Sequence, residues 1–177
     1  MRPICAPDPF QGRTRPHAFS WVVWATTTFL AFVAQMAEGG GMGAWPIGLS
    51  GLISAAMAIL AYVKRGDASI TRGDWLFLGG AFLALPVWAL TSDALWAVVI
   101  LTTVDLLGFG PSFMKAWRRP HEDRIYFYAV MAARNALSIL ALENRSLSTV
   151  LFPGAVGLFC LVYVVLVWRR RAVLVEA

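Results

Sequence analysis

Apolar residues along this chain gather into six long runs separated by short polar stretches. A helix that crosses the hydrocarbon core of a bilayer needs roughly 20 mostly apolar residues, and the runs approach that length. We therefore predict an all-α fold, a polytopic membrane protein built as a six-transmembrane-helix bundle. The predicted spans are Phe19–Ala37, Met42–Val63, Trp75–Thr91, Leu95–Lys115, Ile125–Leu142 and Thr149–Trp168.

The composition agrees with lipid as the solvent. Of the 177 residues, 59% are hydrophobic and 14% are charged, which is outside the range of soluble domains. The net charge of +5 comes from basic residues placed between apolar runs, so we expect the lipid bilayer and no nucleic acid as a partner. The predicted domains are a polar N-terminal tail (1–18), a transmembrane domain (19–168) and a C-terminal tail (169–177).

Lysine and arginine alternate between the segments that join the spans. The N-terminal tail, the second loop, the fourth loop and the C-terminus hold 13 of the 15. The first and third loops hold none, the fifth holds Arg145, and Arg134 falls inside a span. Because positively charged loops stay in the cytoplasm, this alternation predicts an even number of crossings with both termini cytoplasmic.

The two halves of the chain show a faint similarity. Residues 59–61 and 139–141 both read Ile-Leu-Ala, and residues 86–88 and 166–168 both end in Val-Trp. A true duplication of three helices would make the halves inverted repeats, a design in which transporters place the substrate at the midplane. Apolar sequences also align by chance, and both interpretations stay open.

Two charged residues are expected near mid-bilayer, Asp105 in the fourth span and Arg134 in the fifth. A charge at that depth costs about 2.5–3.5 kcal/mol on insertion scales, so each must face the bundle interior. Since these spans are consecutive and antiparallel, we expect the two to form an ion pair, with Asn135 and either Thr102 or Thr103 completing the network. The pair is either a substrate-binding or proton site, or a structural pair that fixes helix packing.

The first predicted span closes on Gln35, Glu38 and Gly39–Gly41. The glycine run has no strand before it and no Lys-Ser/Thr after it, which excludes a phosphate loop. We interpret it as a flexible external turn. Gln35 is predicted either to hydrogen-bond between helices or to line a pathway with the substrate-binding residues.

Gly108, Gly110 and Pro111 interrupt the inner half of the fourth span. Proline removes one backbone hydrogen bond and glycine permits bending, so a kink is expected. The kink serves either as a gating hinge or as a fixed bend.

No other chemistry is indicated. The two cysteines and two histidines are isolated, so we predict no metal site and no cofactor. No lysine lies mid-membrane, which excludes a retinal Schiff base. The interior offers one carboxylate without a histidine, so we predict that the chain is not an enzyme.

The segment Thr102–Trp117, with threonines before a Gly-Phe-x-Pro kink and a basic end, resembles the first helix of the PQ-loop and SWEET-type sugar transporters. The resemblance implies a transport function with Pro111 as the hinge proline, although Ser112 stands where that family has glutamine. The chain is also similar to a group of small bacterial inner-membrane proteins sharing Pro-x-x-Phe-Ser-Trp and Gly-Phe-x-Pro-Ser/Thr-x-x-Lys-x-Trp. That similarity implies no function.

Two functional hypotheses follow. The first is a small transporter or permease for a small polar solute, with substrate-binding residues Asp105, Arg134, Asn135, Gln35 and Thr103. The second is a non-transporting subunit or assembly factor of a larger membrane complex. The substrate, the coupling ion and the oligomeric state, including a homo-oligomer, are not indicated by the sequence.

Overall fold

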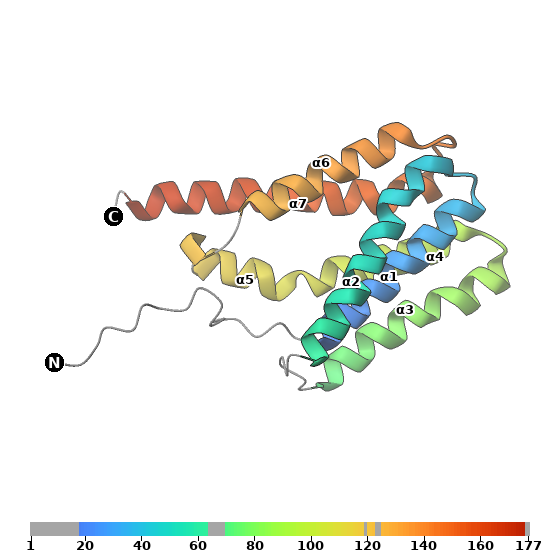
Figure 1. Cartoon of the computed structure of the whole chain (residues 1–177), viewed down its shortest axis with the longest axis horizontal. Helices are drawn as coiled ribbons and strands as arrows, with labels where there is room; N and C mark the ends of the chain where they lie inside the picture. Colours follow the sequence, from blue (N-terminus) through green and yellow to red (C-terminus); the bar gives the residue numbers. More distant parts are fainter. Residues whose placement is uncertain (1–17, 64–69, 119, 123–124, 176–177) are drawn as a thin grey trace.

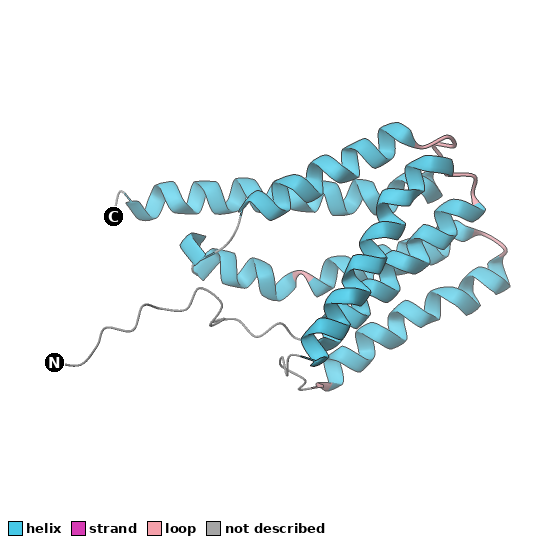
Figure 2. Ribbon diagram, in the orientation of Figure 1, coloured by secondary structure: helices cyan, strands magenta, loops and turns pink. Residues whose placement is uncertain are grey.

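The computed structural model describes residues 18–63, 70–118, 120–122 and 125–175 (Figure 1). Every regular element in these ranges is helical (Figure 2). The predicted N-terminal tail lies outside the described residues, except for Ala18. The elements are α1 (Ala18–Ala37), η1 (Gly41–Ala44), α2 (Trp45–Val63), α3 (Arg72–Thr91), α4 (Ala94–Gly108), α5 (Gly110–Arg118), η2 (Pro120–Glu122), α6 (Ile125–Ala141) and α7 (Leu147–Val175).

The all-α prediction is confirmed, and the helices begin and end close to the predicted positions. Five helical segments are long and apolar enough to cross a membrane: Ala18–Ala37, Gly41–Val63, Arg72–Thr91, Ala94–Arg118 and Leu147–Ala172. Helix α6 is apolar but shorter, at 17 residues. The structure thus has the helices of a multi-pass membrane protein.

Successive helices run antiparallel and form three hairpins, α1 with α2, α3 with α4, and α6 with α7. The turns of these hairpins lie together at one end of the bundle, on the right in Figures 1 and 2, which we call the hairpin end. Helix α1 begins and α7 ends toward the other end, called here the terminal end. Helix α4 joins the hairpins, because it packs against α1, α3 and α7.

The two halves of the chain do not pack alike. Helix α1 packs closely on α2, whereas their counterparts in the proposed duplication, α4 and α6, are not packed neighbours in the part of the chain that the structure describes. Helix α4 packs instead on α7. The helix pairs therefore give no support to two copies of one three-helix unit.

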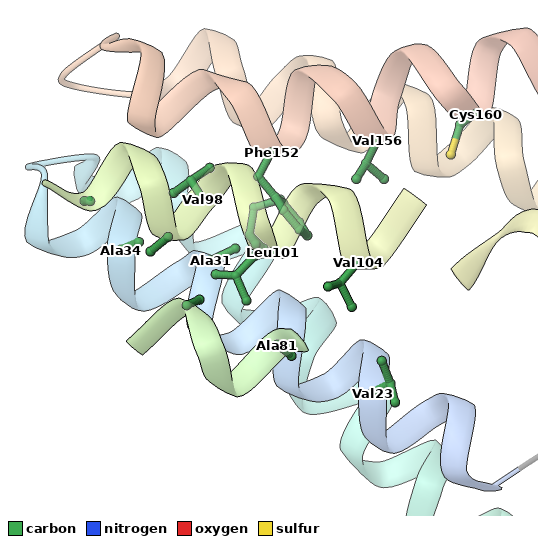
Figure 3. Close-up of a cluster of buried hydrophobic side chains, with 14 of the residues drawn as sticks. Val23, Ala31, Ala34, Ala81, Val98, Leu101, Val104, Phe152, Val156 and Cys160 are labelled. Carbon is green, nitrogen blue, oxygen red and sulfur yellow. The ribbon is translucent and has the colours of Figure 1, made fainter. Parts of the chain in front are cut away.

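Small residues form much of the contact between helices. Ala31 and Ala34 of α1, Ala81 of α3 and Ala97 of α4 are almost fully buried. In lipid, small residues let helix backbones approach closely, because no hydrophobic force drives one helix onto another. Around these alanines, larger side chains of α4 and α7 fill the core, among them Leu101, Phe152 and Val156 (Figure 3).

Large apolar side chains cover the outside of the bundle. Helix α3 is an example, because Leu76, Phe82, Leu83 and Leu90 are all exposed. An apolar surface this extensive is foreign to a soluble monomer but is what lipid tails require. The exposed face of α3 therefore belongs against hydrocarbon.

Helix α7 continues to Val175, past the predicted end of the span at Trp168. The segment predicted as a C-terminal tail therefore starts as a continuation of this helix. Its arginines are held by neighbouring elements, since the Arg170 guanidinium lies 4.3 Å from the Trp117 ring centroid and Arg171 Nε donates to the Pro120 carbonyl (2.9 Å). These contacts fix the terminal end of α7 against α5 and η2.

The close approach of η1 to α6 can be tested at Gly43. A Cβ at this position would fall on the backbone of Ala141 and Leu142, whereas one at Gly79 in α3 would meet nothing within 4 Å. We expect Gly43→Ala to lower the stability of the detergent-solubilised protein by roughly 1–3 kcal/mol through overpacking. Gly79→Ala should be neutral or slightly stabilising, because alanine favours helix. Equal thermal midpoints for the two variants would contradict the packing described.

Candidate functional site

A cavity of about 520 Å³ lies inside the bundle and is lined by every helix except α3. Its size is that of a site for a small molecule, because such sites measure roughly 300–1,000 Å³. The lining residues are Trp21, Trp24, Thr28, Ser50, Ser54, Asp105, Phe109, Ser112, Phe127, Tyr128, Met131, Arg134, Phe152 and Val156.

Each helix presents a stripe of residues to this cavity at helical spacing. Side chains three or four positions apart lie on one helix face. Helix α2 contributes Ser50 and Ser54, and α7 contributes Phe152 and Val156. The stripe of α4 and α5 starts at Asp105 and continues over Phe109 and Ser112, and that of α6 ends at Arg134.

The cavity runs along the bundle rather than across it. With a rise of 1.5 Å per residue, Ser50 and Arg134 lie about 8–10 Å from the hairpin ends of their helices. By the same measure Asp105 lies about 16 Å from the start of α4, and Trp21 and Ser112 lie about 24–27 Å from that end. The charged groups therefore occupy the half nearer the hairpin end, and aromatic side chains surround the half nearer the terminal end.

Asp105 is 4% exposed, so protein groups must replace most of its hydration. Thr27 Oγ1 of α1 donates to its Oδ1 at 2.7 Å. Its other oxygen has no hydrogen-bond partner among the described residues. The carboxylate is thus fixed on one side and open to the cavity on the other.

Arg134 is held by helices α2 and α6. Its Nη1 donates to the Pro46 carbonyl at 3.1 Å and to the Ser50 hydroxyl. Its Nη2 donates to Asn135 Oδ1 at 2.8 Å, while its buried Nε has no partner in the described ranges. These bonds fix the guanidinium at the end of the cavity toward the hairpins.

The predicted direct ion pair is wrong. Asp105 and Arg134 line the same cavity, but no nitrogen–oxygen pair of these two described residues lies within ion-pair distance, and each is held by other groups. The reason is the helix arrangement, since the fourth and fifth spans are not packed neighbours and α4 packs on α7 instead of α6. The two charges face a common space and not each other.

The prediction for Thr103 is also wrong, because its side chain is exposed and donates to the Val99 carbonyl of its own helix at 2.8 Å. Thr103 lies two positions from Asp105 along the helix, and this offset rotates its side chain by about 200°, away from the cavity. Thr102, three residues from Asp105, is buried on the inner side. Its hydroxyl has no hydrogen-bond partner in the part of the chain described.

Asn135 is fully buried but does not line the cavity. Its Oδ1 accepts from Arg134, and its Nδ2 donates to the Met131 carbonyl at 2.9 Å. The predicted substrate-binding role is therefore corrected to that of a positioning residue for Arg134. Gly157 of α7 makes room for it, since a Cβ on that glycine would lie 3.1 Å from Asn135 Cβ.

Gln35 closes the hairpin end instead of lining the cavity. Its Nε2 donates to the Thr149 carbonyl of α7 at 2.6 Å, and the side chain is completely buried. Of the two interpretations of Gln35, the hydrogen bond between helices is the one observed. Beside it, Ser138 Oγ of α6 donates to the Gly43 carbonyl at 2.6 Å.

The glycine turn after α1 is held by the turn between α6 and α7. Asn144 Nδ2 donates to the Glu38 carbonyl at 2.8 Å, and Ser148 Oγ donates to Glu38 Oε2 at 3.0 Å. The Glu143 amide donates to the Gly40 carbonyl at 3.2 Å. This network does not fit the expected flexible turn, and it seals the hairpin end with hydrogen bonds between two hairpins.

The fourth span is interrupted where glycine and proline are expected to bend it. Helix α4 ends at Gly108, and α5 begins at Gly110, so Phe109 sits at the break. Pro111 has no amide hydrogen and cannot donate to the Leu107 carbonyl. At Gly108 a Cβ would lie 3.0 Å from Trp24 Nε1, so glycine makes room for that indole ring.

Aromatic rings form a continuous chain around the terminal half of the cavity. Phe109 stacks on Trp24, with ring centroids 5.3 Å apart, and lies 4.7 Å from Phe159 of α7. Tyr163 of α7 stacks on Tyr128 of α6 at 3.9 Å. The wall toward the terminal end is thus aromatic. Rings of α1 and α7 contact Phe109 at the break between α4 and α5, and a ring of α6 stacks on α7.

A second hollow of about 440 Å³ lies between α1 and α2, lined by apolar and aromatic side chains such as Phe19, Ile59 and Tyr62. It has no charged group to orient a solute, and its surface is of the kind that lipid tails contact. We therefore assign the candidate site to the cavity that holds Asp105 and Arg134.

Several lining residues escaped the sequence prediction. Thr28, Ser50 and Ser54 are ordinary residues in apolar helices, and hydroxyls in such helices also bond to their own backbone. The signal that could have found them is spacing: Ser50 and Ser54 are four apart, as one helix face requires. Thr27, the partner of Asp105, carries no such signal.

Comparison with family models, with curated proteins and with solved structures finds no match. No group of three or more potential metal-ligating side chains occurs among the described residues.

The hydrogen bond to Asp105 can be tested with two adjacent threonines. Thr27→Val removes the partner of a buried carboxylate, which should cost about 1–3 kcal/mol of stability. Thr26→Val is the matched control, because Thr26 Oγ1 donates only to the Val22 carbonyl of its own helix. Thermal unfolding in detergent should show a lower midpoint for Thr27→Val alone. Equal midpoints would show that Thr27 does not stabilise Asp105.

Proposed function

We propose that this chain is a small permease of the bacterial inner membrane that carries a small polar solute through the cavity between Asp105 and Arg134. Intramembrane charges are costly and mark solute or proton pathways in membrane proteins. Here two opposite charges line one cavity while each is held by separate partners, and this observation carries the proposal.

The asymmetry of the cavity supports a transport cycle. One end is closed by the hydrogen bonds of Gln35, Ser138 and the glycine turn, whereas aromatic rings wall the cavity toward the other end. In alternating access, one side of the site is closed while the other is open. This arrangement corresponds to a state closed at the hairpin end, and the opposite state requires the polar seal to part.

The break at Phe109 is the pivot in this proposal. It lies between the charged and aromatic halves of the cavity, and its ring contacts α1 and α7. Interrupted helices lining a cavity recur in transporters because the broken backbone moves at low cost. Bending at Gly108–Pro111 would shift α5 and its cavity residue Ser112 relative to α4. The hinge role that the resemblance implies for Pro111 belongs to the same motion.

The proposed threading has six crossings, with α4 and α5 together as the fourth and α6 as the fifth. Both termini are then cytoplasmic, because the arginine-rich segments lie at the terminal end. The aromatic half of the cavity faces the cytoplasm, and the sealed hairpin end faces the periplasm. An inverted duplication is not required for this mechanism.

Transport can be measured with purified protein in proteoliposomes on solid-supported membranes, by adding panels of amino acids, amines, organic acids and sugars. We expect a current or tracer uptake with one class, and a loss of about tenfold or more in flux with Asp105→Asn and with Arg134→Gln, as for the loss of a charged hydrogen bond. Asp93→Asn is the control, since Asp93 is exposed at the start of α4.

Unchanged flux in both cavity variants would remove the proposed site. Absence of flux with every class, together with a stoichiometric partner that copurifies in mild detergent, would favour the alternative of a non-transporting subunit or assembly factor. The two outcomes separate an incorrect site from an incorrect function.

The threading is tested with single cysteines in a background of Cys5→Ser and Cys160→Ala. Ser92 and His121 are both exposed, at opposite ends of the bundle. A membrane-impermeant thiol reagent should label Ser92→Cys in spheroplasts and His121→Cys only after lysis. The reverse labelling would invert the orientation, and labelling of both in spheroplasts would exclude the six-crossing arrangement.

A further inference from the structure

We propose that the solute is a zwitterion of the amino-acid type with a bulky apolar side group. Its ammonium would bind Asp105, and its carboxylate would bind Arg134. This inference rests on the proposed permease function and names its substrate class. It follows from the unused bonding capacity of the two charges, from their electrostatic balance and from the aromatic wall beside them.

Both charged groups have capacity left for a ligand. Asp105 uses one oxygen for Thr27, and the second is without a hydrogen-bond partner among the described residues. A carboxylate accepts up to about four hydrogen bonds, so an ammonium with three donors suits it. Arg134 donates three hydrogen bonds, to Pro46, Ser50 and Asn135. This leaves guanidinium donors for a carboxylate.

The balance of charge favours a ligand that carries both signs. Inside lipid, a lone anion drawn to Arg134 would also meet the repulsion of Asp105, and a lone cation would meet that of Arg134. A zwitterion satisfies both groups and adds no net charge to the bundle. Sugars would leave both charges without an opposite charge to pair with, which is costly away from water.

The position of Arg134 keeps the two charges available. Because Ser50, Pro46 and Asn135 hold the guanidinium on the side of α2 and α6, it does not fold back onto Asp105 on α4. The carboxylate is likewise held by α1 through Thr27. A bridging ligand therefore replaces no existing ion pair.

The rest of the cavity suits an apolar side group. Toward the terminal end the lining changes to Trp21, Trp24, Phe109 and Phe127, with Met131 between them and the charges. Aromatic rings pack well against flat or branched apolar groups. A volume of about 520 Å³ accommodates an amino acid with a large side chain.

Equilibrium binding to the purified full chain in detergent tests this directly, by calorimetry with matched compounds. The zwitterions are phenylalanine and leucine. For each, the anion lacks the amine (3-phenylpropionate, 4-methylpentanoate), and the cation lacks the carboxylate (2-phenylethylamine, 3-methylbutylamine). We expect at least one zwitterion to bind about 10- to 100-fold more tightly than its own anion and cation, the loss of one charged hydrogen bond.

The variants assign each end of the ligand. Asp105→Asn should abolish the preference for the zwitterion over its anion, and Arg134→Gln the preference over its cation. Arg145→Gln and Asp93→Asn are matched controls and should keep both preferences, because both residues are exposed and lie outside the cavity lining. If a cavity variant does not stay monodisperse, the comparison of compounds on the unchanged chain decides alone.

The inference is overturned if neither amino acid binds, or if the anion or the cation binds as tightly as the zwitterion. Flux of another solute class in proteoliposomes, without binding of either amino acid, would contradict the proposed substrate class but not the proposed permease function. Binding with the expected preferences but without flux would support the site chemistry and sink the transport function.

Discussion

Hydrocarbon offers no hydrogen bonds, so every charged group inside this bundle must be held by the protein itself. That constraint explains the placement of Thr27 beside Asp105 and of Ser50, Pro46 and Asn135 around Arg134. A bundle that needed only to pack would neutralise the two charges against each other. Here polar groups from three helices hold the two charges separately, and both charges line the same cavity.

The same constraint also explains the hydrogen bonds between polar groups at the hairpin end. There, polar side chains and turn carbonyls of two hairpins bond to each other. Small residues let α1, α3 and α4 approach closely. The bundle therefore combines a well-bonded end with a hollow half, and the interrupted fourth span lies beside the hollow.

The sequence predicts well those features of the fold that depend on neighbouring residues in the chain. The hydrocarbon thickness sets the length of each run, so the helix limits follow from hydropathy, and the cost of burying charge identifies Asp105 and Arg134. Helix pairing depends on contacts between distant parts of the chain. The ion pair was expected because the fourth and fifth spans are consecutive, but α4 packs against α7. Of the two threonines expected to complete the network, helical phase turns Thr102 inward and Thr103 outward. Thr27 can be identified as the partner of Asp105 only from the structure, in which α1 packs against α4.

Helix α6, which carries Arg134, has 17 residues, and at 1.5 Å per residue it spans about 25 Å, less than the roughly 30 Å of an average hydrocarbon core. A membrane adapts to such a mismatch by thinning around the short segment. In the proposed six-crossing threading, headgroups and water would then reach deeper beside α6 than around the other helices. The bilayer itself would shorten the distance between the aqueous phase and the guanidinium, so the local thickness of the membrane becomes part of the site.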